Sequence, residues 1–403
     1  MRVAVIGGGA SGMISAGFCA KNGHIVDLFE SNEKLGKKIY ITGKGRCNVT
    51  NASNAENFLS NVVNNQKFLY SAINSFDSFS TINFFESMGI PIKIERGNRA
   101  FPKSDKSSDI IKGLTNFITK NGVNIHLNNK VLSIEKCNDK FSITTSFGRY
   151  NNYDATICCT GGSTYSATGS KGDGYKFAKS FGHTVTKIFP SLVPIVLNDE
   201  FIKNVQGLSL KNVKLIAYKS NKIFKEFFGE MLFTSNGISG PIALSMSSYI
   251  NKESNISLKI DLKPALTIDE IKNRFCTESS QHKDVQVSTF MSSYLPKSLI
   301  IPFLNKCEID KFIKVKSLTT KQQDKIIDTL KNFELNYNKV DELDFGIITC
   351  GGVCVKEINP KTMESKLIKG LYFAGEVIDV DALTGGYNLQ IAFSTGFLAG
   401  NSI

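Results

Sequence analysis

The sequence contains no tryptophan, only four histidines and no apolar run near the roughly 18 residues that a membrane-spanning helix needs. The four histidines stand apart from one another along the chain, which argues against a histidine-based metal site. The apolar start of the chain is too short for a secretion signal. We therefore expect a cytoplasmic protein with no metal and no membrane partner.

Cysteine is present but never in a Cys-x-x-Cys pair, and the spacing of Cys350 and Cys354 fits neither a zinc nor a thioredoxin motif. The nine cysteines are odd in number, and several lie in apolar segments. This usage indicates free, buried thiols in a reducing compartment.

Basic residues outnumber acidic ones and give the 403-residue chain a net charge of +12, yet no block of five or six basic residues occurs. No nucleic-acid-binding motif is visible either. We therefore predict a small-molecule substrate and no nucleic-acid partner, with the basic charge serving to attract an anionic cofactor or substrate. The oligomeric state is left open.

The first thirty residues predict a strand, a Gly-x-Gly-x-x-Gly turn, a helix and a second strand that ends in an acid. In such a unit Gly7 makes the tight turn, Gly9 lets a pyrophosphate approach the backbone, and Gly12 lets the helix pack closely on the sheet. The helix start, with Ala10 and Ser11, offers free N–H groups to phosphates. The alternative is an ordinary glycine-rich turn in an α/β protein.

Glu30 follows the last of these glycines at close to the roughly 20-residue spacing expected for the acid that binds an adenosine ribose. A carboxylate at this position favours a 2′-hydroxyl over a 2′-phosphate. We therefore predict a Rossmann-like nucleotide-binding unit that prefers an unphosphorylated ribose.

A long polar, glycine-rich loop follows over residues 34–51, and such loops in compact domains are usually functional. Its backbone donors and basic side chains suit a diphosphate, although a solvated basic loop is the alternative. The predicted contacts in this loop are Lys38, Thr42, Gly43, Arg46, Cys47 and Asn48.

The rest of the chain predicts a divided α/β domain. We expect helices over 68–88 and 109–121, and a strand over 153–160 that stops at Gly161 and Gly162. Another strand ends at Gly375 and Glu376, and the last helix carries a stripe of small residues. The nucleotide-binding domain is thus predicted to close only when both chain ends meet.

The predicted domains are residues 1–190 and 346–403 for the two parts of the nucleotide-binding domain, with an insert over 191–345. Within the insert we expect a β-barrel over about 191–263 and 334–345, and a helical unit over about 264–333. Thr267 and Glu270 form a helix-capping signal near the start of the helical part.

These motifs together resemble the HI0933-like family of flavoproteins, a branch of the two-dinucleotide-binding-domain FAD oxidoreductases. The resemblance spans nearly the whole chain and rests on the following segments: 7–12, 43–51, 101–104, 159–163, 168–175, 232–241, 351–353, 374–379 and 384–389. One departure is Lys44, which stands where the family motif usually has a third glycine.

The resemblance implies a glutathione-reductase-like FAD-binding domain interrupted by an inserted β-barrel plus helical domain, and tightly bound FAD. It implies that Glu376 accepts hydrogen bonds from ribityl hydroxyls, and that the helix starting near Tyr387 directs N–H groups at the flavin. The remaining implied cofactor contacts are Val131, Thr160, Gly161, Gly162, Gly375, Asp379, Gly386, Asn388 and Leu389.

The predicted function is an FAD-dependent oxidoreductase that transfers hydride between flavin and a small organic substrate, with NAD(P)H or oxygen as the other redox partner. No second Gly-x-Gly-x-x-Gly unit occurs, so NAD(P)H is expected to bind only transiently. The catalytic residue is unknown; Cys47, Arg46 and Tyr387 are weak candidates. We expect the substrate between the insert and the isoalloxazine ring.

Two alternatives remain open at this point. One is a flavin-containing, redox-responsive binding protein without rapid turnover, because no catalytic base is evident. The other is a flavin-dependent RNA-modifying enzyme, which would draw on the basic charge.

Overall fold

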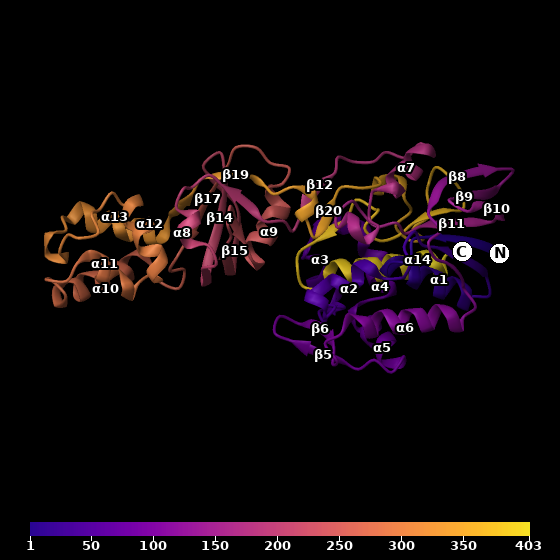
Figure 1. Cartoon of the computed structure of the whole chain (residues 1–403), viewed down its shortest axis with the longest axis horizontal. Helices are drawn as coiled ribbons and strands as arrows, with labels where there is room; N and C mark the ends of the chain where they lie inside the picture. The colour runs from indigo at the N-terminus through magenta and orange to yellow at the C-terminus, as the bar shows by residue number, and fades with distance from the viewer. The chain divides into compact units, whose positions relative to one another are not determined.

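The computed structural model describes residues 1–403, and the chain separates into two compact units. Unit 1 joins Met1–Ser191 to Leu343–Ile403, and unit 2 is Leu192–Glu342. Unit 1 therefore contains both ends of the chain, which lie near each other in Figure 1.

A five-stranded parallel sheet forms the centre of unit 1, with the strand order β21-β11-β1-β2-β7. Its strands are β1 (Arg2–Ile6), β2 (Ile25–Phe29), β7 (Asn124–His126), β11 (Ala155–Cys158) and β21 (Leu371–Phe373). The middle strand β1 is apolar and buried from Val3 to Ile6, as expected for a parallel strand covered on both faces. This confirms the predicted Rossmann-type parallel sheet.

Smaller antiparallel sheets complete unit 1. They pair β8 (Val131–Cys137), β9 (Lys140–Thr145) and β10 (Gly148–Tyr153); β3 (Thr50–Asn51), β6 (Arg99–Pro102) and β5 (Ile92–Glu95); β12 (Phe189–Ser191) with β20 (Ile348–Cys350); and β22 (Asp381–Ala382) with β4 (Val62–Asn64). Strand β12 ends the first segment of unit 1 and β20 lies in its second segment, so this pair connects the two segments that unit 2 separates in the sequence.

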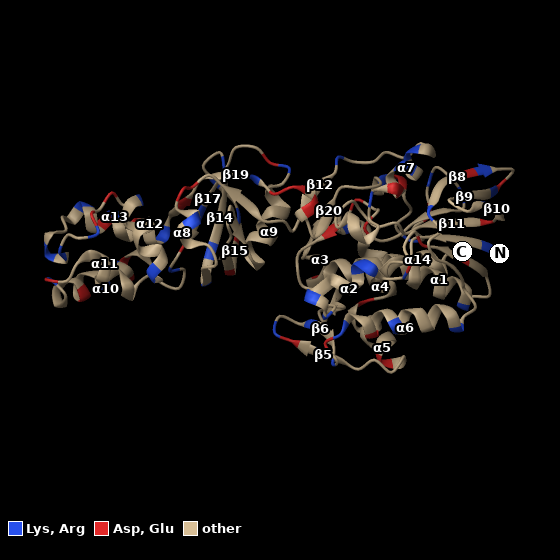
Figure 2. Cartoon of the chain, viewed as in Figure 1, with Lys and Arg blue, Asp and Glu red and all other residues tan.

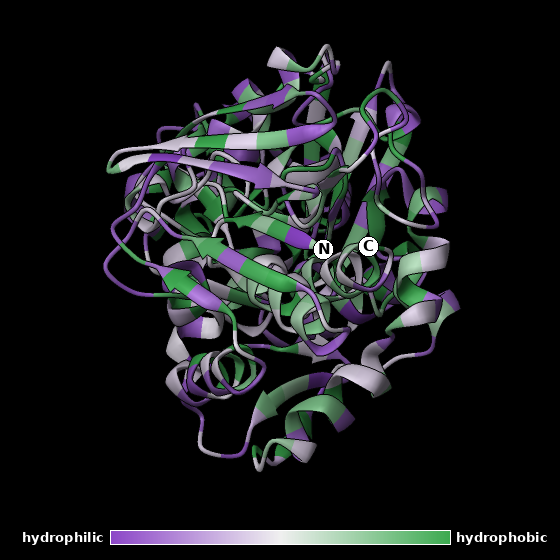
Figure 3. Cartoon of the chain, turned by 90° about the vertical axis from the view of Figure 1, so that its right-hand side faces the viewer, coloured by the Kyte–Doolittle hydropathy of each residue, from purple (hydrophilic) through white to green (hydrophobic).

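The first and last helices of unit 1 pack so closely that their backbones are in contact. The helices of unit 1 are α1 (Ala10–Lys21), α2 (Lys37–Ile41), α3 (Ala55–Leu59), α4 (Tyr70–Ser75), α5 (Ser78–Ser87), α6 (Ser107–Lys120), α7 (Asp173–Ser180) and α14 (Tyr387–Asn401). A β-carbon on Gly396 or Gly400 would lie 2.6 Å from the carbonyl oxygen of Ser11 or Ser15, respectively. Figure 3 shows green, hydrophobic residues along the strands and helices next to the two termini.

Residues 68–88 do not form the single helix that the sequence predicts. Helix α4 ends at Ser75, and α5 begins at Ser78. Between them Asp77 acts as the N-cap of α5, because its side chain accepts a hydrogen bond of 2.7 Å from the Ser80 N–H. An aspartate side chain that accepts a backbone N–H in this way marks the start of a new helix. The prediction of one helix over 68–88 rested on apolar periodicity, which takes no account of such a cap.

Unit 2 contains a seven-stranded antiparallel sheet with the order β18-β17-β14-β15-β16-β13-β19. Its strands are β13 (Ile195–Leu197), β14 (Ser209–Lys219), β15 (Lys222–Phe233), β16 (Gly237–Ser239), β17 (Ile256–Asp261), β18 (Phe333–Leu335) and β19 (Tyr337–Val340). The pairings establish a sheet, and its closure into a barrel stays a prediction.

The helices of unit 2 are α8 (Ile202–Val205), α9 (Pro241–Ile250), α10 (Ile268–Gln281), α11 (Val287–Phe290), α12 (Lys297–Lys306) and α13 (Thr320–Lys331). The predicted capping signal is confirmed, since Thr267 and Glu270 form a reciprocal capping box at the start of α10. No helix of either unit is both long enough and apolar enough to cross a lipid bilayer.

A buried histidine links distant loops of unit 1. The Nδ1 atom of His183 lies 3.1 Å from a carboxylate oxygen of Glu357, and its Nε2 atom lies 2.8 Å from the hydroxyl of Ser365. The Ser365 oxygen also accepts backbone N–H groups. A neutral imidazole that donates through Nδ1 and accepts through Nε2 satisfies this arrangement. Burial lowers the pKa of His183 despite the neighbouring carboxylate.

We expect His183 to make unit 1 less stable in acid. A lowered pKa means that the unfolded chain binds this proton more readily, so stability is present above the ordinary histidine pKa of 6.5 and falls as the pH drops below it. The His183→Gln variant should lose about 1–3 kcal/mol at pH 8 through its broken hydrogen bonds, and should show a shallower decline towards pH 5.

The measurement is the free energy of unfolding by urea at each pH. The matched control is His282→Gln, which changes an exposed histidine of unit 2 and should keep the wild-type pH dependence. An unchanged decline in His183→Gln would contradict the assignment.

Candidate functional site

The three motif glycines after β1 meet different surroundings. Gly7 has a φ of +104°, and a β-carbon on it would lie 2.5 Å from the carbonyl oxygen of Cys159. A β-carbon on Gly12 would lie 1.8 Å from the carbonyl oxygen of Gly7. Gly9, by contrast, has no heavy atom within 4 Å of that position. Two glycines are thus required by packing, and Gly9 leaves open space in front of its backbone.

Glu30 directly follows β2, and its carboxylate is bound by the glycine turn that follows β1. One of its oxygens accepts a hydrogen bond of 2.7 Å from the Gly8 N–H, and the other accepts bonds from Ser31 and from the backbone and side chain of Asn32. An ionised carboxylate offers about four acceptor positions, two on each oxygen. The oxygen that binds Gly8 therefore keeps capacity for a ligand hydroxyl.

Residues of the 128–131 segment lie beside this acid. The Asn129 N–H donates to the Glu30 carbonyl oxygen at 2.8 Å, and Val131 begins β8 two residues later. Val131 was predicted as a cofactor contact and Asn129 was not; the side-chain oxygen of Asn129 is buried without a partner. Only the spatial proximity to Glu30 identifies it.

The glycine-rich loop turns sharply between α2 and β3. Gly43, Lys44, Gly45 and Cys47 all have positive φ angles, between 57° and 83°. This backbone places Cys47 fully inside the protein, where burial raises the pKa of its thiol to about 12. Thr42 uses its hydroxyl to bind the Ile39 carbonyl oxygen at 2.7 Å.

The Arg46 side chain is engaged by an ionic cluster. Its guanidinium pairs with Glu95 and, at 2.7 Å, with Asp105, and it lies 4.1 Å from the centre of the Phe101 ring. Lys93 pairs with the same two carboxylates. The cluster fastens the glycine-rich loop to β5 and β6, a role that sequence spacing could not reveal.

The segment after β11 approaches the chain's C-terminal part. A β-carbon on Gly162 would lie 2.7 Å from a carboxylate oxygen of Glu376, and one on Gly161 would lie 2.8 Å from the Ser170 hydroxyl. The structure therefore brings 160–162 together with the predicted ribityl-binding acid. The hydroxyl oxygen of Thr160 is buried and has no partner.

Lys38 and Glu376 form an ion pair of 2.6 Å between the N-terminal loop and the C-terminal segment of unit 1. Glu376 also accepts hydrogen bonds from the Thr164 hydroxyl and the Thr349 N–H. A β-carbon on the preceding Gly375 would lie 2.5 Å from the Ser11 hydroxyl at the start of α1. Predicted contacts from opposite ends of the sequence thus lie close together in unit 1.

Helix α14 begins directly after Gly386, whose φ of +100° and contact with the Thr50 backbone leave no room for a β-carbon. Tyr387 is nearly buried, and burial raises its pKa. The Asn388 side chain binds the Ala382 backbone through both its oxygen and its nitrogen. Its amide therefore fixes the start of the helix, and Leu389 follows in the first turn.

The set of predicted residues fits a large polar ligand. Buried side-chain oxygens of Asn48 and Asp379 have no hydrogen-bond partner in the protein, and both residues were predicted as cofactor contacts. Such atoms are costly to bury unpaired. Together with the open space at Gly9, they fit a cofactor that supplies both donors and bulk, as FAD does.

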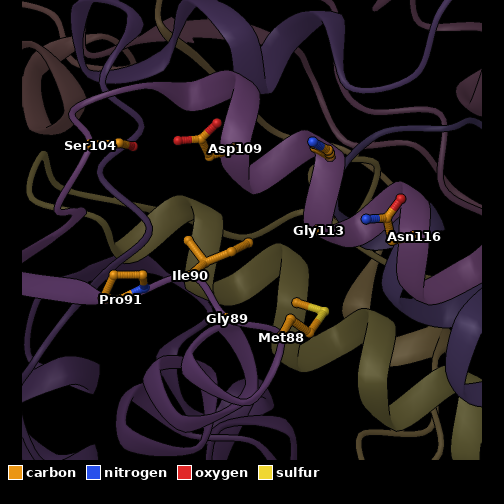
Figure 4. A pocket seen from close by; sticks show the side chains of 9 residues that line it. Met88, Gly89, Ile90, Pro91, Ser104, Asp109, Gly113 and Asn116 are labelled. Atoms are coloured by element: carbon orange, nitrogen blue, oxygen red, sulfur yellow. The ribbon is translucent and has the colours of Figure 1, made fainter.

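A surface groove of about 280 Å³ lies elsewhere in unit 1 (Figure 4). It is lined by residues of the α5–β5 turn and of α6, including Ile90, Asp109 and Asn116. A second, of about 300 Å³, lies in unit 2 next to α12. Neither is lined by a predicted cofactor contact.

Comparison with known proteins identifies the family. The model of the HI0933-like protein Rossmann domain matches residues 1–402. A 3-dehydro-bile acid delta(4,6)-reductase of Clostridium scindens is 30% identical over 100% of this chain and 98% of its own length. A ribosomal RNA dihydrouridine synthase of Escherichia coli is 30% identical over 98% and 95% of the two chains.

The chain belongs to the HI0933-like family, as the sequence motifs predicted, and is an FAD-dependent oxidoreductase of undetermined substrate. Among solved structures, the Sdh1 complex of Mycobacterium smegmatis in its apo form has a TM-score of 0.50 at 14% identity. That similarity covers 100% of this chain and 67% of the other, and it supports the fold alone.

Two single substitutions should separate folding from cofactor binding. Gly9→Val should fold with nearly wild-type stability, because its φ of −86° suits any residue and the added atoms meet open space. It should nevertheless retain little FAD, since the side chain fills the predicted pyrophosphate position. Gly12→Ala should instead lower the melting temperature, because its β-carbon overlaps the Gly7 carbonyl oxygen.

The measurements are thermal unfolding and the flavin-to-protein absorbance ratio after desalting. Full flavin retention by Gly9→Val would show that the open space is not part of the cofactor site.

Proposed function

We propose that unit 1 binds FAD between its N-terminal and C-terminal segments, and that the protein transfers hydride between the flavin and a small organic substrate. The observation that carries the proposal is the approach of predicted contacts from distant segments in one unit: Lys38 pairs with Glu376, and a β-carbon on Gly162 would lie 2.7 Å from the Glu376 carboxylate. Each was predicted from sequence as a contact of one cofactor.

In this proposal Glu30 binds the adenosine ribose and the turn at Gly9 binds the pyrophosphate. Glu376 orients the ribityl chain, and Lys38 balances its charge at 2.6 Å. Bound FAD supplies the redox chemistry, in which a hydride is accepted or donated. The N-terminus of α14 directs backbone N–H groups of its first turn towards the ring edge and stabilises negative charge there.

The candidate catalytic side chains differ in what they can do. Cys47, with a pKa of about 12, keeps its proton at neutral pH and is a poor nucleophile. Arg46 is engaged by Glu95 and Asp105. Tyr387, whose pKa is raised by burial, stays a neutral phenol that can donate a hydrogen bond to substrate or flavin. We therefore favour Tyr387 among the three.

The purified full-length protein should be yellow and keep its flavin spectrum through desalting. Anaerobic mixing with NADH and with NADPH should bleach the band near 450 nm with one donor, and a small enone, imine or other organic acceptor should restore it, measured by stopped-flow absorbance. A colourless protein that gains no spectrum with added FAD would refute the proposal. If the donor bleaches the flavin but none of the acceptors restores the band, a redox-responsive binding protein would be favoured instead.

Glu30→Gln should weaken FAD binding about ten- to a hundred-fold. The amide oxygen can still accept the Gly8 N–H, but the amide nitrogen cannot accept from Ser31 and Asn32, and the charge-assisted bond to ribose, worth roughly 1.5–3 kcal/mol, is lost. FAD affinity measured by fluorescence quenching checks this. The control is Glu33→Gln, an exposed carboxylate of the same loop, which should leave the affinity unchanged.

An RNA substrate is the second candidate. It is favoured by the relative named as a ribosomal RNA dihydrouridine synthase, which matches almost the full chain, and by the net charge of +12. The two candidates share the flavin chemistry and differ only in what receives the hydride. Flavin reoxidation by ribosomal RNA, with dihydrouridine detected by mass spectrometry, would decide for RNA.

A further inference from the structure

The side chain of Asn51, the last residue of β3, joins two turns that are far apart in the sequence. Its Nδ2 atom donates hydrogen bonds of 3.0 Å to the Gly97 carbonyl oxygen and 3.1 Å to the Gly385 carbonyl oxygen. An amide nitrogen carries two N–H groups, so both are used. Because Asn51 is only 2% exposed, the two bonds are shielded from water. The amide therefore holds the segment before α14 against the turn between β5 and β6.

The same strand supports the start of α14 through its backbone. A β-carbon on Gly386 would lie 2.4 Å from the carbonyl carbon of Thr50, so the two segments are in direct contact. The ring of Tyr387, the first helical residue, packs edge-on against Phe58, with 5.1 Å between the ring centres. The hairpin that carries Gly97 is paired along the whole of β5, so Asn51 links the helix start to a firm support.

The backbone N–H groups at this helix end are free to bind a ligand. The first intrahelical bond is made by the Gln390 N–H to the Gly386 carbonyl oxygen at 3.2 Å. The helix therefore leaves the N–H groups of Tyr387, Asn388 and Leu389 without an acceptor. No side chain caps the helix, and α14 has no acidic or basic residue, so Figure 2 draws it in tan throughout. The electrostatic effect of this end thus comes from its backbone and depends on where the first turn is held.

We propose that Asn51 is a positioning residue that holds the first turn of α14 towards the flavin and thereby sets the redox potential of the flavin. The inference rests on the proposed function, in which the N–H groups of this turn stabilise negative charge at the ring edge. Reduced flavin carries more negative charge there than oxidised flavin, so donors held in place favour reduction. Without the Asn51 amide, the Gly385 carbonyl oxygen loses this donor and the first turn is free to shift, which lowers the potential.

The test compares the full-length protein with the variants Asn51→Ala and Asn51→Leu. Alanine leaves space for a water molecule to bind the two carbonyl groups, and leucine keeps the side-chain volume. The matched control is Ser394→Ala, which removes a buried hydrogen bond of 2.6 Å to the Phe76 carbonyl oxygen from the middle of the same helix. Hydrogen–deuterium exchange over residues 385–391 reports on the first turn without flavin. Anaerobic redox titration gives the midpoint potential of bound flavin, and thermal unfolding identifies misfolded variants.

We expect both Asn51 variants to exchange faster in the first turn of α14. Their preference for reduced over oxidised FAD should fall about tenfold, which lowers the potential by about 30 mV for a two-electron couple. Ser394→Ala should lose stability but keep the wild-type potential. Unchanged exchange in the Asn51 variants, or a wild-type potential in variants that retain FAD, would overturn this proposal alone. A wild-type protein that binds no FAD would refute the proposed function and the redox role of Asn51 together.

Discussion

The close packing of α1 against α14 is the constraint on which the rest of unit 1 depends. Ser11 and Ser15 of α1 present backbone oxygens to Gly396 and Gly400 of α14, and the Ser15 hydroxyl donates to the Gly396 carbonyl oxygen at 3.0 Å. A methyl group at either glycine would push the helices apart, and overpacking of this kind typically costs about 1–3 kcal/mol. The contact fixes where the last segment of the chain returns, and with it Gly375.

Local sequence patterns predicted the centre of unit 1 well. The strand–glycine turn–helix unit follows from requirements that lie within thirty residues, and the structure shows why Gly7 and Gly12 allow no substitute there. The same holds for the strand that ends at Gly161. Gly7 and Gly12 are dictated by contacts with backbone atoms, and Gly161 by its φ of +72° and the nearby Ser170 hydroxyl, so the residue type itself carries the information.

Interactions between distant segments could not be read in the same way. Nothing in the sequence pairs Lys38 with Glu376, which are 338 positions apart, although both were predicted as contacts of one ligand. Arg46 was predicted as a cofactor contact from its motif, yet its guanidinium is engaged by Glu95 and Asp105. A charged side chain has several possible partners, and only the fold decides among them. The break between α4 and α5 at Asp77 was not predicted either, because the apolar periodicity over 68–88 indicated one helix and a single capping residue did not change that prediction.

The buried polar groups of unit 1 fall into two kinds, and the difference bears on function. Asp27 accepts hydrogen bonds from Arg2, from the Tyr153 hydroxyl and from His126, so its burial is fully compensated within the protein. Asn48 and Asp379 instead keep a buried oxygen without a partner.

Unpartnered oxygens also occur at Thr81 and Gln390, which were not predicted as cofactor contacts, so a single one by itself indicates little. An amide or carboxylate oxygen is a stronger acceptor than a hydroxyl oxygen, and leaving one unpaired costs about 1–3 kcal/mol or more. Asn48 lies in the glycine-rich loop and Asp379 just beyond Glu376, on the two chain segments that Lys38 and Glu376 already join. The protein supplies donors to every side of the buried Asp27 carboxylate, whereas it leaves these two oxygens without a donor. Their position on the two segments joined by this ion pair is consistent with a ligand that supplies the missing donors.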